Sequence, residues 1–200
     1  YEDGHLETYV ADYSRQNQIF YLLGLFVVLI LLIGGKKGIK AIITLAFTIF
    51  AVLKVLLPLM LKGINPIPIS VLISIIVTIV TIFIVGGINN KSISAIIGTS
   101  SGVVVAGIMA YIVGSQVMLT GLSGEEATML MYIPQGIDFD FKGLLFAGII
   151  LGALGAIMDV GMSIASSIDE IHNANKNLTT RELFNAGMNV GKDIMGTMSN

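Results

Sequence analysis

The sequence predicts an all-α protein, a polytopic membrane bundle of about five transmembrane helices with an amphipathic cytoplasmic helix near the C-terminus. Its composition is the first observation: 54% of the 200 residues are hydrophobic and only 12% are charged, whereas about a quarter of a typical soluble domain is charged. The second is a mean hydropathy of +0.89. The third is that the apolar residues form runs approaching the roughly 20 residues that a membrane-spanning helix needs.

Composition also excludes several kinds of function. The chain has no cysteine, which rules out disulfides, a thiolate nucleophile and a cysteine-based metal site. The net charge is −2 and the lysines are scattered over short loops, unlike the basic face of a nucleic-acid-binding protein. We expect no metal, no cofactor and no nucleic-acid partner. The predicted partners are the lipid bilayer and an unknown small solute or ion.

Residues 1–18 form an acidic lead before the first apolar run. They contain Glu2, Asp3, Glu7 and Asp12 but no apolar stretch long enough to fold alone. The chain begins at Tyr1, and no basic region of the kind that opens a signal peptide precedes the first span. We therefore expect an extracytoplasmic lead and a chain that is a fragment of a larger bundle.

A membrane domain is predicted over residues 19–171. Short clusters of glycine, asparagine, proline and lysine separate its apolar runs, and the longest connection covers residues 120–142. Pro68 fits just inside the start of the third span, because the first amides of a helix have no intrahelical partner. The predicted spans are about 19–33, 39–61, 67–85, 93–119 and 143–171.

The orientation of these spans follows from the positive charges, which in short loops stay preferentially on the cytoplasmic side. Lys36, Lys37 and Lys91 fall on the same side as the basic residues of the C-terminal tail. The prediction is an N-terminus outside and a tail in the cytoplasm.

Residues 172–200 are amphipathic rather than wholly apolar. Thr179 or Thr180 can cap a helix, with Glu182 in the first turn, where the helix dipole favours an acid. Apolar side chains from Leu183 to Met198 then supply one side of it. We expect a cytoplasmic helix that lies along the membrane surface or packs under the bundle, leading to further spans.

Small residues recur at every fourth position in the last two predicted spans. On a helix this spacing forms a smooth face along which another backbone can approach closely. The alternative is a thin-walled cavity lined by Thr99, Ser100 and Ser101. The residues predicted to pack helices are Gly98, Gly102, Ala106, Ala110, Gly114, Gly148, Gly152 and Ala156.

Asp159 is the strongest single pointer to function, because a carboxylate in lipid needs a partner, water or a proton. Ser163, Ser166 and Glu170 follow at i+4, i+7 and i+11, on the same helical face. Either the helix emerges from lipid there, with Asp159 bonded to a neighbouring helix, or the four residues form a proton or cation path. We favour the path, since ionisable groups at membrane depth are mostly functional.

Lys54 is the second charge inside a predicted span. Pro58 removes the hydrogen bond to the Lys54 carbonyl, so we expect a kink and a freed carbonyl, a feature of some ion sites. Lys54 lies about 10 Å and Asp159 about 24 Å from the outer ends of their spans, which argues against a direct pair. Lys54 either snorkels to the interface or contributes to the ion path.

Enzyme motifs lack their required partners. Gly98–Gly102 matches G-x-S-x-G, but it lies inside an apolar helix, and both histidines lie outside the spans. H-E-x-x-H is absent, and Asp159 has no second carboxylate clearly at membrane depth. We therefore predict that the protein is not an enzyme.

Two segments carry a resemblance to a known family. The segments GAIMDVGMSIASSIDEI, residues 155–171, and GKDIMGTM, residues 191–198, resemble the YibE/F family of bacterial multi-spanning membrane proteins, and residues 9–13 support the likeness. The resemblance implies a bacterial cytoplasmic membrane, an additional N-terminal span with an extracellular portion, and further spans after residue 198. It does not imply a biochemical activity.

Two functional hypotheses follow from different classes of protein. The leading one is a permease or transporter in which Asp159, Ser163, Ser166 and Glu170 form the proton- or ion-linked part of a solute path. The alternative is a non-transporting scaffold that docks a cytoplasmic partner through residues 172–200, or associates with copies of itself. An intramembrane hydrolase would need a second buried carboxylate or a histidine from other spans.

Overall fold

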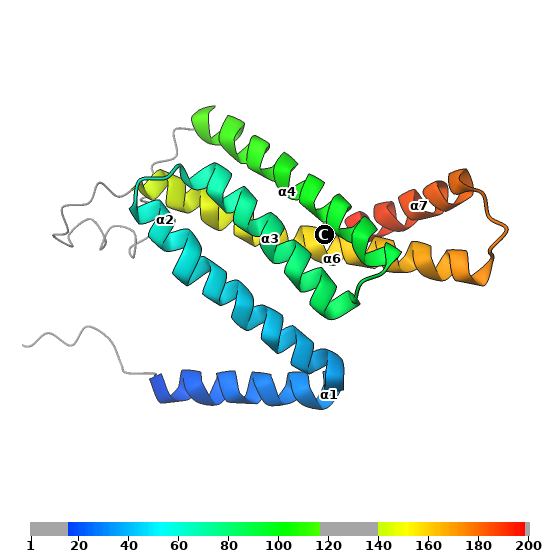
Figure 1. The fold of residues 1–200 in the computed structure, drawn as a ribbon, viewed down its shortest axis with the longest axis horizontal. Helices are drawn as coiled ribbons and strands as arrows, with labels where there is room; N and C mark the ends of the chain where they lie inside the picture. Colours follow the sequence, from blue (N-terminus) through cyan, green and yellow to red (C-terminus); the bar gives the residue numbers. More distant parts are fainter. Residues whose placement is uncertain (1–15, 117–139, 199–200) are drawn as a thin grey trace, which may run out of the picture. The chain divides into compact units, whose positions relative to one another are not determined.

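The computed structural model describes residues 16–116 and 140–198, and the regular structure in these ranges is helical, with no strand (Figure 1). Residues 1–15 of the acidic lead and residues 117–139, which include most of the predicted connection 120–142, lie outside the described residues. The predicted all-α class is confirmed. The helices are α1 (Gln16–Ala51), η1 (Val52–Leu56), α2 (Leu57–Leu61), α3 (Pro66–Gly86), α4 (Asn90–Gln116), α6 (Phe141–Ala174) and α7 (Thr180–Met198).

Four helical stretches in the described part of the chain are long and apolar enough to cross a membrane: Asn17–Leu61, Pro66–Gly86, Asn90–Gly114 and Phe141–Ala174. The first has 45 residues and contains both predicted spans 19–33 and 39–61. Gly35 interrupts it with φ 49° and ψ −128°, angles that residues with a Cβ rarely adopt. The count of five spans, which requires a separate crossing on each side of Gly35, stays a prediction.

The chain divides into two compact units, Tyr1–Ile43 and Thr44–Asn200. Within the first, α1 bends at Gly35, and Gly38 lies so close to the Ile30 carbonyl that a side chain at position 38 would collide with it. Large apolar side chains on both sides of this bend are exposed, including Ile33 and Ile39. Extensive apolar surface of this kind is typical of membrane contact.

In the second unit, α3, α4 and α6 pack against one another and form the core. The end of α1 and η1 add to it. Many apolar side chains on these helices point outward and are exposed. The buried ones form a narrow cluster at the centre. The buried apolar residues of this cluster are Ala51, Leu56, Ile73, Val77, Val103, Ala147, Ile150 and Leu154.

The chain just before Pro58 is π-helical. The Leu57 amide donates to the Val52 carbonyl, five residues back instead of four. Pro58 has no amide to donate to Lys54. The chain is therefore π-helical beside Lys54, while the kink and the freed Lys54 carbonyl stay predictions.

Side-chain caps mark the starts of the later helices. Asn65 accepts a hydrogen bond from the Ile67 amide at the start of α3. Asp140 accepts from the Gly143 amide at 2.8 Å, at the start of α6. These local bonds satisfy amides that a helix start leaves free.

Thr179, rather than Thr180, caps α7. The Thr179 amide donates to Glu182 Oε2 at 2.8 Å, and the Glu182 amide donates to Thr179 Oγ1 at 3.4 Å. This reciprocal pair is a capping box, and it fixes the point at which the chain turns back after α6.

α7 runs antiparallel to α6 (Figure 1). Gly187 faces Ile168 and Gly191 faces Ile164, so an increasing residue number in α7 meets a decreasing number in α6. The glycine side of α7 thus makes the contact. Its large apolar side chains stay exposed, for example Phe184 at 64%.

Candidate functional site

Within the unit Thr44–Asn200, no other helix covers the face of α6 that carries Asp159. Asp159, Ser163 and Glu170 are all exposed, and at 100° per residue they lie on one side of the helix. No hydrogen bond or ion pair joins Asp159 to any described residue. The neighbouring helix considered as a partner for Asp159 is therefore not one of the helices in the unit Thr44–Asn200.

Small residues continue this face toward the start of α6. Gly148, Gly152 and Ala156 are exposed, and a Cβ at Gly148 or Gly152 would meet no atom within 4 Å. The packing role predicted for Gly148 and Gly152 has no partner within the unit Thr44–Asn200, whereas Ala156 lines a groove between α4 and α6. Gly148, Gly152, Asp159 and Ser163 together form the open face of α6.

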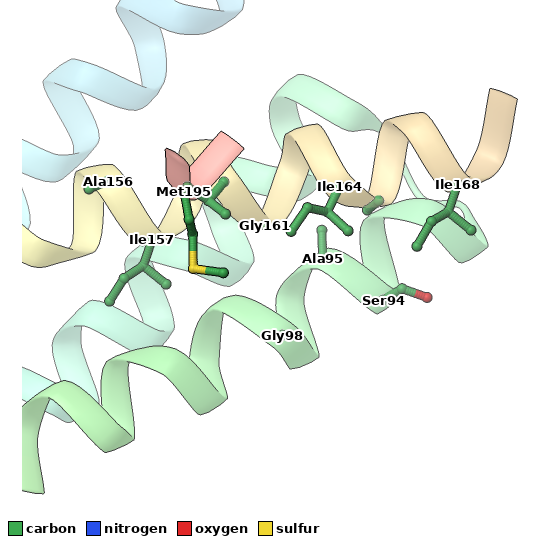
Figure 2. A pocket seen from close by; sticks show the side chains of 11 residues that line it. Ser94, Ala95, Gly98, Ala156, Ile157, Gly161, Ile164, Ile168 and Met195 are labelled. Atoms are coloured by element: carbon green, nitrogen blue, oxygen red, sulfur yellow. The ribbon is translucent and has the colours of Figure 1, made fainter. Parts of the chain in front are cut away.

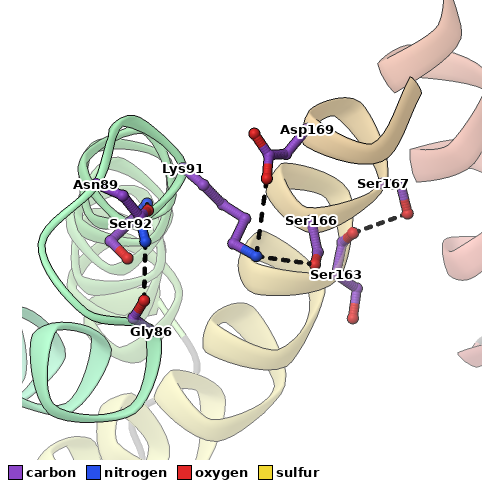
Figure 3. A network of polar contacts seen from close by, with 8 residues as sticks. All are labelled: Gly86, Asn89, Lys91, Ser92, Ser163, Ser166, Ser167 and Asp169. Carbon is purple, nitrogen blue, oxygen red and sulfur yellow. Dashed lines mark hydrogen bonds and ion pairs between the residues drawn. The ribbon is translucent and has the colours of Figure 1, made fainter. Parts of the chain in front are cut away.

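Ser166 lies apart from the open face, in a polar contact with the start of α4. Lys91 Nζ donates to Ser166 Oγ at 3.4 Å and lies 4.0 Å from Asp169 Oδ2 (Figure 3). The predicted stripe is therefore divided: Ser166 is half-buried beside Lys91, while Glu170 stays exposed. Sequence reasoning used Lys91 only for orientation, because its 75-residue separation from Ser166 hides the contact.

Lys54 lies in η1 and is exposed. No ion pair joins it to Asp159 in the described ranges, and their difference in depth stays a prediction. The two charges are therefore not directly paired, and the part of Lys54 in an ion path stays a prediction.

Two of the small residues predicted on α4 lie at its contact with α6. A Cβ at Gly102 would stand 2.8 Å from Ile157 Cγ2, and one at Gly114 would overlap the Phe146 ring. Ala106 and Ala110, on the same helix, are half-buried.

Gly98 has a different environment. It is exposed, a Cβ there would meet nothing within 4 Å, and it lines a groove between α4 and α6. The packing prediction for Gly98 therefore also lacks a partner among the described residues.

A row of buried hydroxyls on α3 was missed by the sequence reasoning. Ser70, Ser74 and Thr78 are each 0% exposed, and Ser70 and Thr78 donate to carbonyls four residues back at 2.7 and 2.8 Å. Their i, i+4, i+8 spacing is the signal that could have found them.

Thr99 on α4 is also 0% exposed. A Cβ at Gly161 of α6 would lie 2.5 Å from its Oγ1, so the hydroxyl packs directly onto a helix backbone. The cavity-lining role considered for Thr99, Ser100 and Ser101 is not seen for Ser101 either, which is exposed and donates to the Ile97 carbonyl at 2.7 Å. Hydroxyls bonded to their own helix are common in membrane bundles.

The chemistry available on the open face is that of one carboxylate and one hydroxyl. No group of three or more His, Asp or Glu side chains that could hold a metal ion occurs in residues 16–116 and 140–198. Asp159 can bind and release a proton, or pair with a cation that approaches the uncovered side of α6.

Long apolar helices and a carboxylate on one of them define an integral membrane protein with a polar site on a membrane helix. A comparison with protein-family models narrows this class: the model of the YibE/F-like protein matches residues 22–200. The chain belongs to the YibE/F family. No curated protein and no solved structure matches it.

Proposed function

We propose that the chain forms the membrane core of a permease that moves a small solute or an ion, and that it is not an enzyme. Asp159 carries the proposal, because it is an exposed carboxylate in an apolar helix and has no described partner. A charge at that position is costly in lipid, and such charges mark substrate paths and proton relays. Asp159 is the group that takes up and releases the coupled proton or cation.

The length of α6 supports a path between membrane depth and water. Its 34 residues extend about 51 Å, against roughly 30 Å for the hydrocarbon core. Asp159 lies about 27 Å from the start of α6, while Glu170 lies close to the other end. Ser163 follows Asp159 by one turn, and Ser166 and Glu170 continue toward water. Lys54 is a second charge that would influence the same ion.

Vesicles containing the purified protein test this role. Proton uptake is followed with a pH-sensitive dye, and Na⁺, K⁺ and Mg²⁺ fluxes with ion-selective dyes. Asp159→Asn should reduce the coupled flux at least tenfold, because the amide cannot exchange a proton. Asp193→Asn, a matched change on exposed α7, should leave it unchanged. If Asp159→Asn left every flux unaltered, the permease proposal would be abandoned.

The proposed location is a bacterial cytoplasmic membrane, with the start of α1 outside and α7 in the cytoplasm. The support is the distribution of lysines over the loops. Because the chain has no cysteine, single cysteines report topology cleanly. A membrane-impermeant maleimide should label Lys62→Cys on intact cells and Lys192→Cys only after permeabilisation. The reverse labelling would refute this orientation.

A second candidate function is a scaffold without transport activity. The exposed apolar side of α7 supports it: Phe184 is 64% and Met188 47% exposed. Crosslinking in membranes should then recover one cytoplasmic partner with the wild type and not with Phe184→Ser. Arg181→Ser, a matched exposed control, should keep that partner. A purified protein that supports flux without a partner would argue against the scaffold.

A further inference from the structure

An apolar groove lies between α4 and α6 where α7 approaches them. It has a volume of about 490 Å³, within the roughly 300–1,000 Å³ of typical small-molecule sites. Gly98 forms part of one wall, and Ile164 and Met195 face the groove from α6 and α7 (Figure 2). Since a Cβ at Gly98 would meet no atom within 4 Å, the described side chains leave this space unfilled.

A second cavity, of about 270 Å³, lies at the start of α4 and carries charge. Lys91, Asp169 and His172 line it. Lys91 Nζ and Asp169 Oδ2 are 4.0 Å apart, and their side chains are 24% and 44% exposed. The cavity thus presents one cation and one anion that are loosely paired and accessible.

The two cavities adjoin one another. Ser94, Ala165 and Ile168 line both. The result is a single amphipathic groove, apolar along the membrane helices and charged where the start of α4 meets the end of α6. An occupant must therefore combine a long apolar portion with a polar end.

We propose that this groove binds a phospholipid with a phosphoethanolamine head group. The acyl chain lies against Gly98 and Met195, the phosphate pairs with Lys91, and the ammonium pairs with Asp169. A zwitterionic head matches the two opposite charges better than an anionic head, which would meet the Asp169 carboxylate. A lipid is the occupant because the groove lies on helices apolar enough to be surrounded by lipid.

This site does not include Asp159, although Lys91 also donates to Ser166 of the proposed solute path. Asp159 lines neither cavity, and it lies on the open face of α6. Loss of lipid binding would therefore leave the role of Asp159 standing, and loss of flux in Asp159→Asn would leave the lipid site standing.

Native mass spectrometry of the full, delipidated chain tests the proposal. The probes are phosphatidylethanolamine, phosphatidylcholine and phosphatidylglycerol with identical acyl chains. We expect phosphatidylethanolamine to bind at least tenfold more tightly than the other two, because only its head group carries a cationic N–H donor for the Asp169 carboxylate while its phosphate meets Lys91. Equal binding of the three lipids would overturn the proposal.

Variants locate the lipid within the groove. Gly98→Leu should lower the binding of all three lipids at least tenfold, and Gly148→Leu, the same change on the open face, should not. Lys91→Met should weaken the binding of all three phospholipids, whereas Lys91→Arg, which keeps the positive charge, should bind them as the wild type does. Asp169→Asn should abolish the preference for ethanolamine over choline while binding persists.

Two results would contradict this assignment. Unchanged lipid binding in Gly98→Leu would exclude the groove. If Gly98→Leu changed the oligomeric state on size exclusion and left lipid binding intact, the occupant of the groove would be a second copy of the chain. Circular dichroism confirms that each variant is folded. If Lys91→Met does not fold, Gly98→Leu and Asp169→Asn decide the question.

Discussion

One face of α6 is buried against α3 and α4, whereas the opposite face, between residues 148 and 163, meets no other helix within the unit Thr44–Asn200. Phe146, Ile150 and Leu154 belong to the buried face and are at most 4% exposed. Gly148 and Asp159 lie about 180° away at 100° per residue and are exposed. The face that is covered is built of large apolar side chains, and the face that carries glycine and a carboxylate is left open.

The comparison shows that a small-residue pattern does not identify a helix contact by itself. Gly102 and Gly114 on α4 touch side chains of α6, while Gly148 and Gly152, with the same four-residue spacing, touch nothing within 4 Å. Small residues allow close approach on either surface. Whether another helix packs against such a face depends on the rest of the bundle.

The largest expected effect concerns the charge on the open face. Asp159→Leu should favour membrane insertion of α6 by about 3 kcal/mol, because a central aspartate costs roughly 2.5–3.5 kcal/mol. The measurement is the inserted fraction of residues 141–174 in a translocon reporter. Asp169→Leu, near the helix end, should give a clearly smaller gain. Equal gains would mean that Asp159 does not lie at membrane depth.

Overpacking the covered side should have the next largest effect. Gly114→Leu places a side chain in the space of the Phe146 ring, so we expect a loss of about 1–3 kcal/mol in stability. A thermal unfolding series in detergent measures it. Gly148→Leu, its counterpart on the open face, should change stability by less than about 0.5 kcal/mol. A Gly114→Leu protein with an unchanged midpoint would contradict this α4–α6 contact.

A smaller effect is expected where a hydroxyl meets a backbone. Gly161→Ala brings a Cβ to within 2.5 Å of Thr99 Oγ1, and the strain should outweigh the roughly 1 kcal/mol that alanine gains over glycine in a helix. Gly155→Ala has open space and should stabilise the protein. Adding Thr99→Ala should rescue Gly161→Ala. If Gly161→Ala and Gly155→Ala raised the midpoint of thermal unfolding equally, α4 and α6 would have to be further apart at Gly161 than the structure shows.

The smallest effect is a pH dependence at the capping box of α7. Hydrogen bonds from the Thr179 amide and then its hydroxyl hold the pKa of Glu182 below its ordinary value of 4.5. The folded state favours the ionised carboxylate, so its contribution is fully present above the ordinary value and is lost as the pH falls through the lowered pKa.

Amide hydrogen exchange in α7 between about pH 6 and about pH 3 measures this dependence, because acid should increase opening of the first turn once the intrinsic exchange rate is corrected. Glu182→Gln should remove the dependence, and Asp193→Asn should retain it. An unchanged profile in Glu182→Gln would rule out the capping box as its source.

Local features of the fold could be predicted from sequence because neighbouring residues decide them. Asn65, Pro58 and Glu182 act on backbone groups within a few positions of their own, so the start of α3, the irregular turn beside Lys54 and the start of α7 all follow from short patterns. The antiparallel return of α7 along α6 could not be predicted, since it depends on Gly187 meeting Ile168.

The site divides in the same way. The sequence by itself determined the class of protein, the family and the helical face shared by Asp159 and Ser163, because apolar run length and helical periodicity are properties of the chain. Only the tertiary structure decided that this face is open, that Lys91 meets Ser166 and Asp169, and that Ser70, Ser74 and Thr78 are buried. These facts depend on which helices lie side by side. That arrangement is determined by contacts between residues that are distant in the sequence.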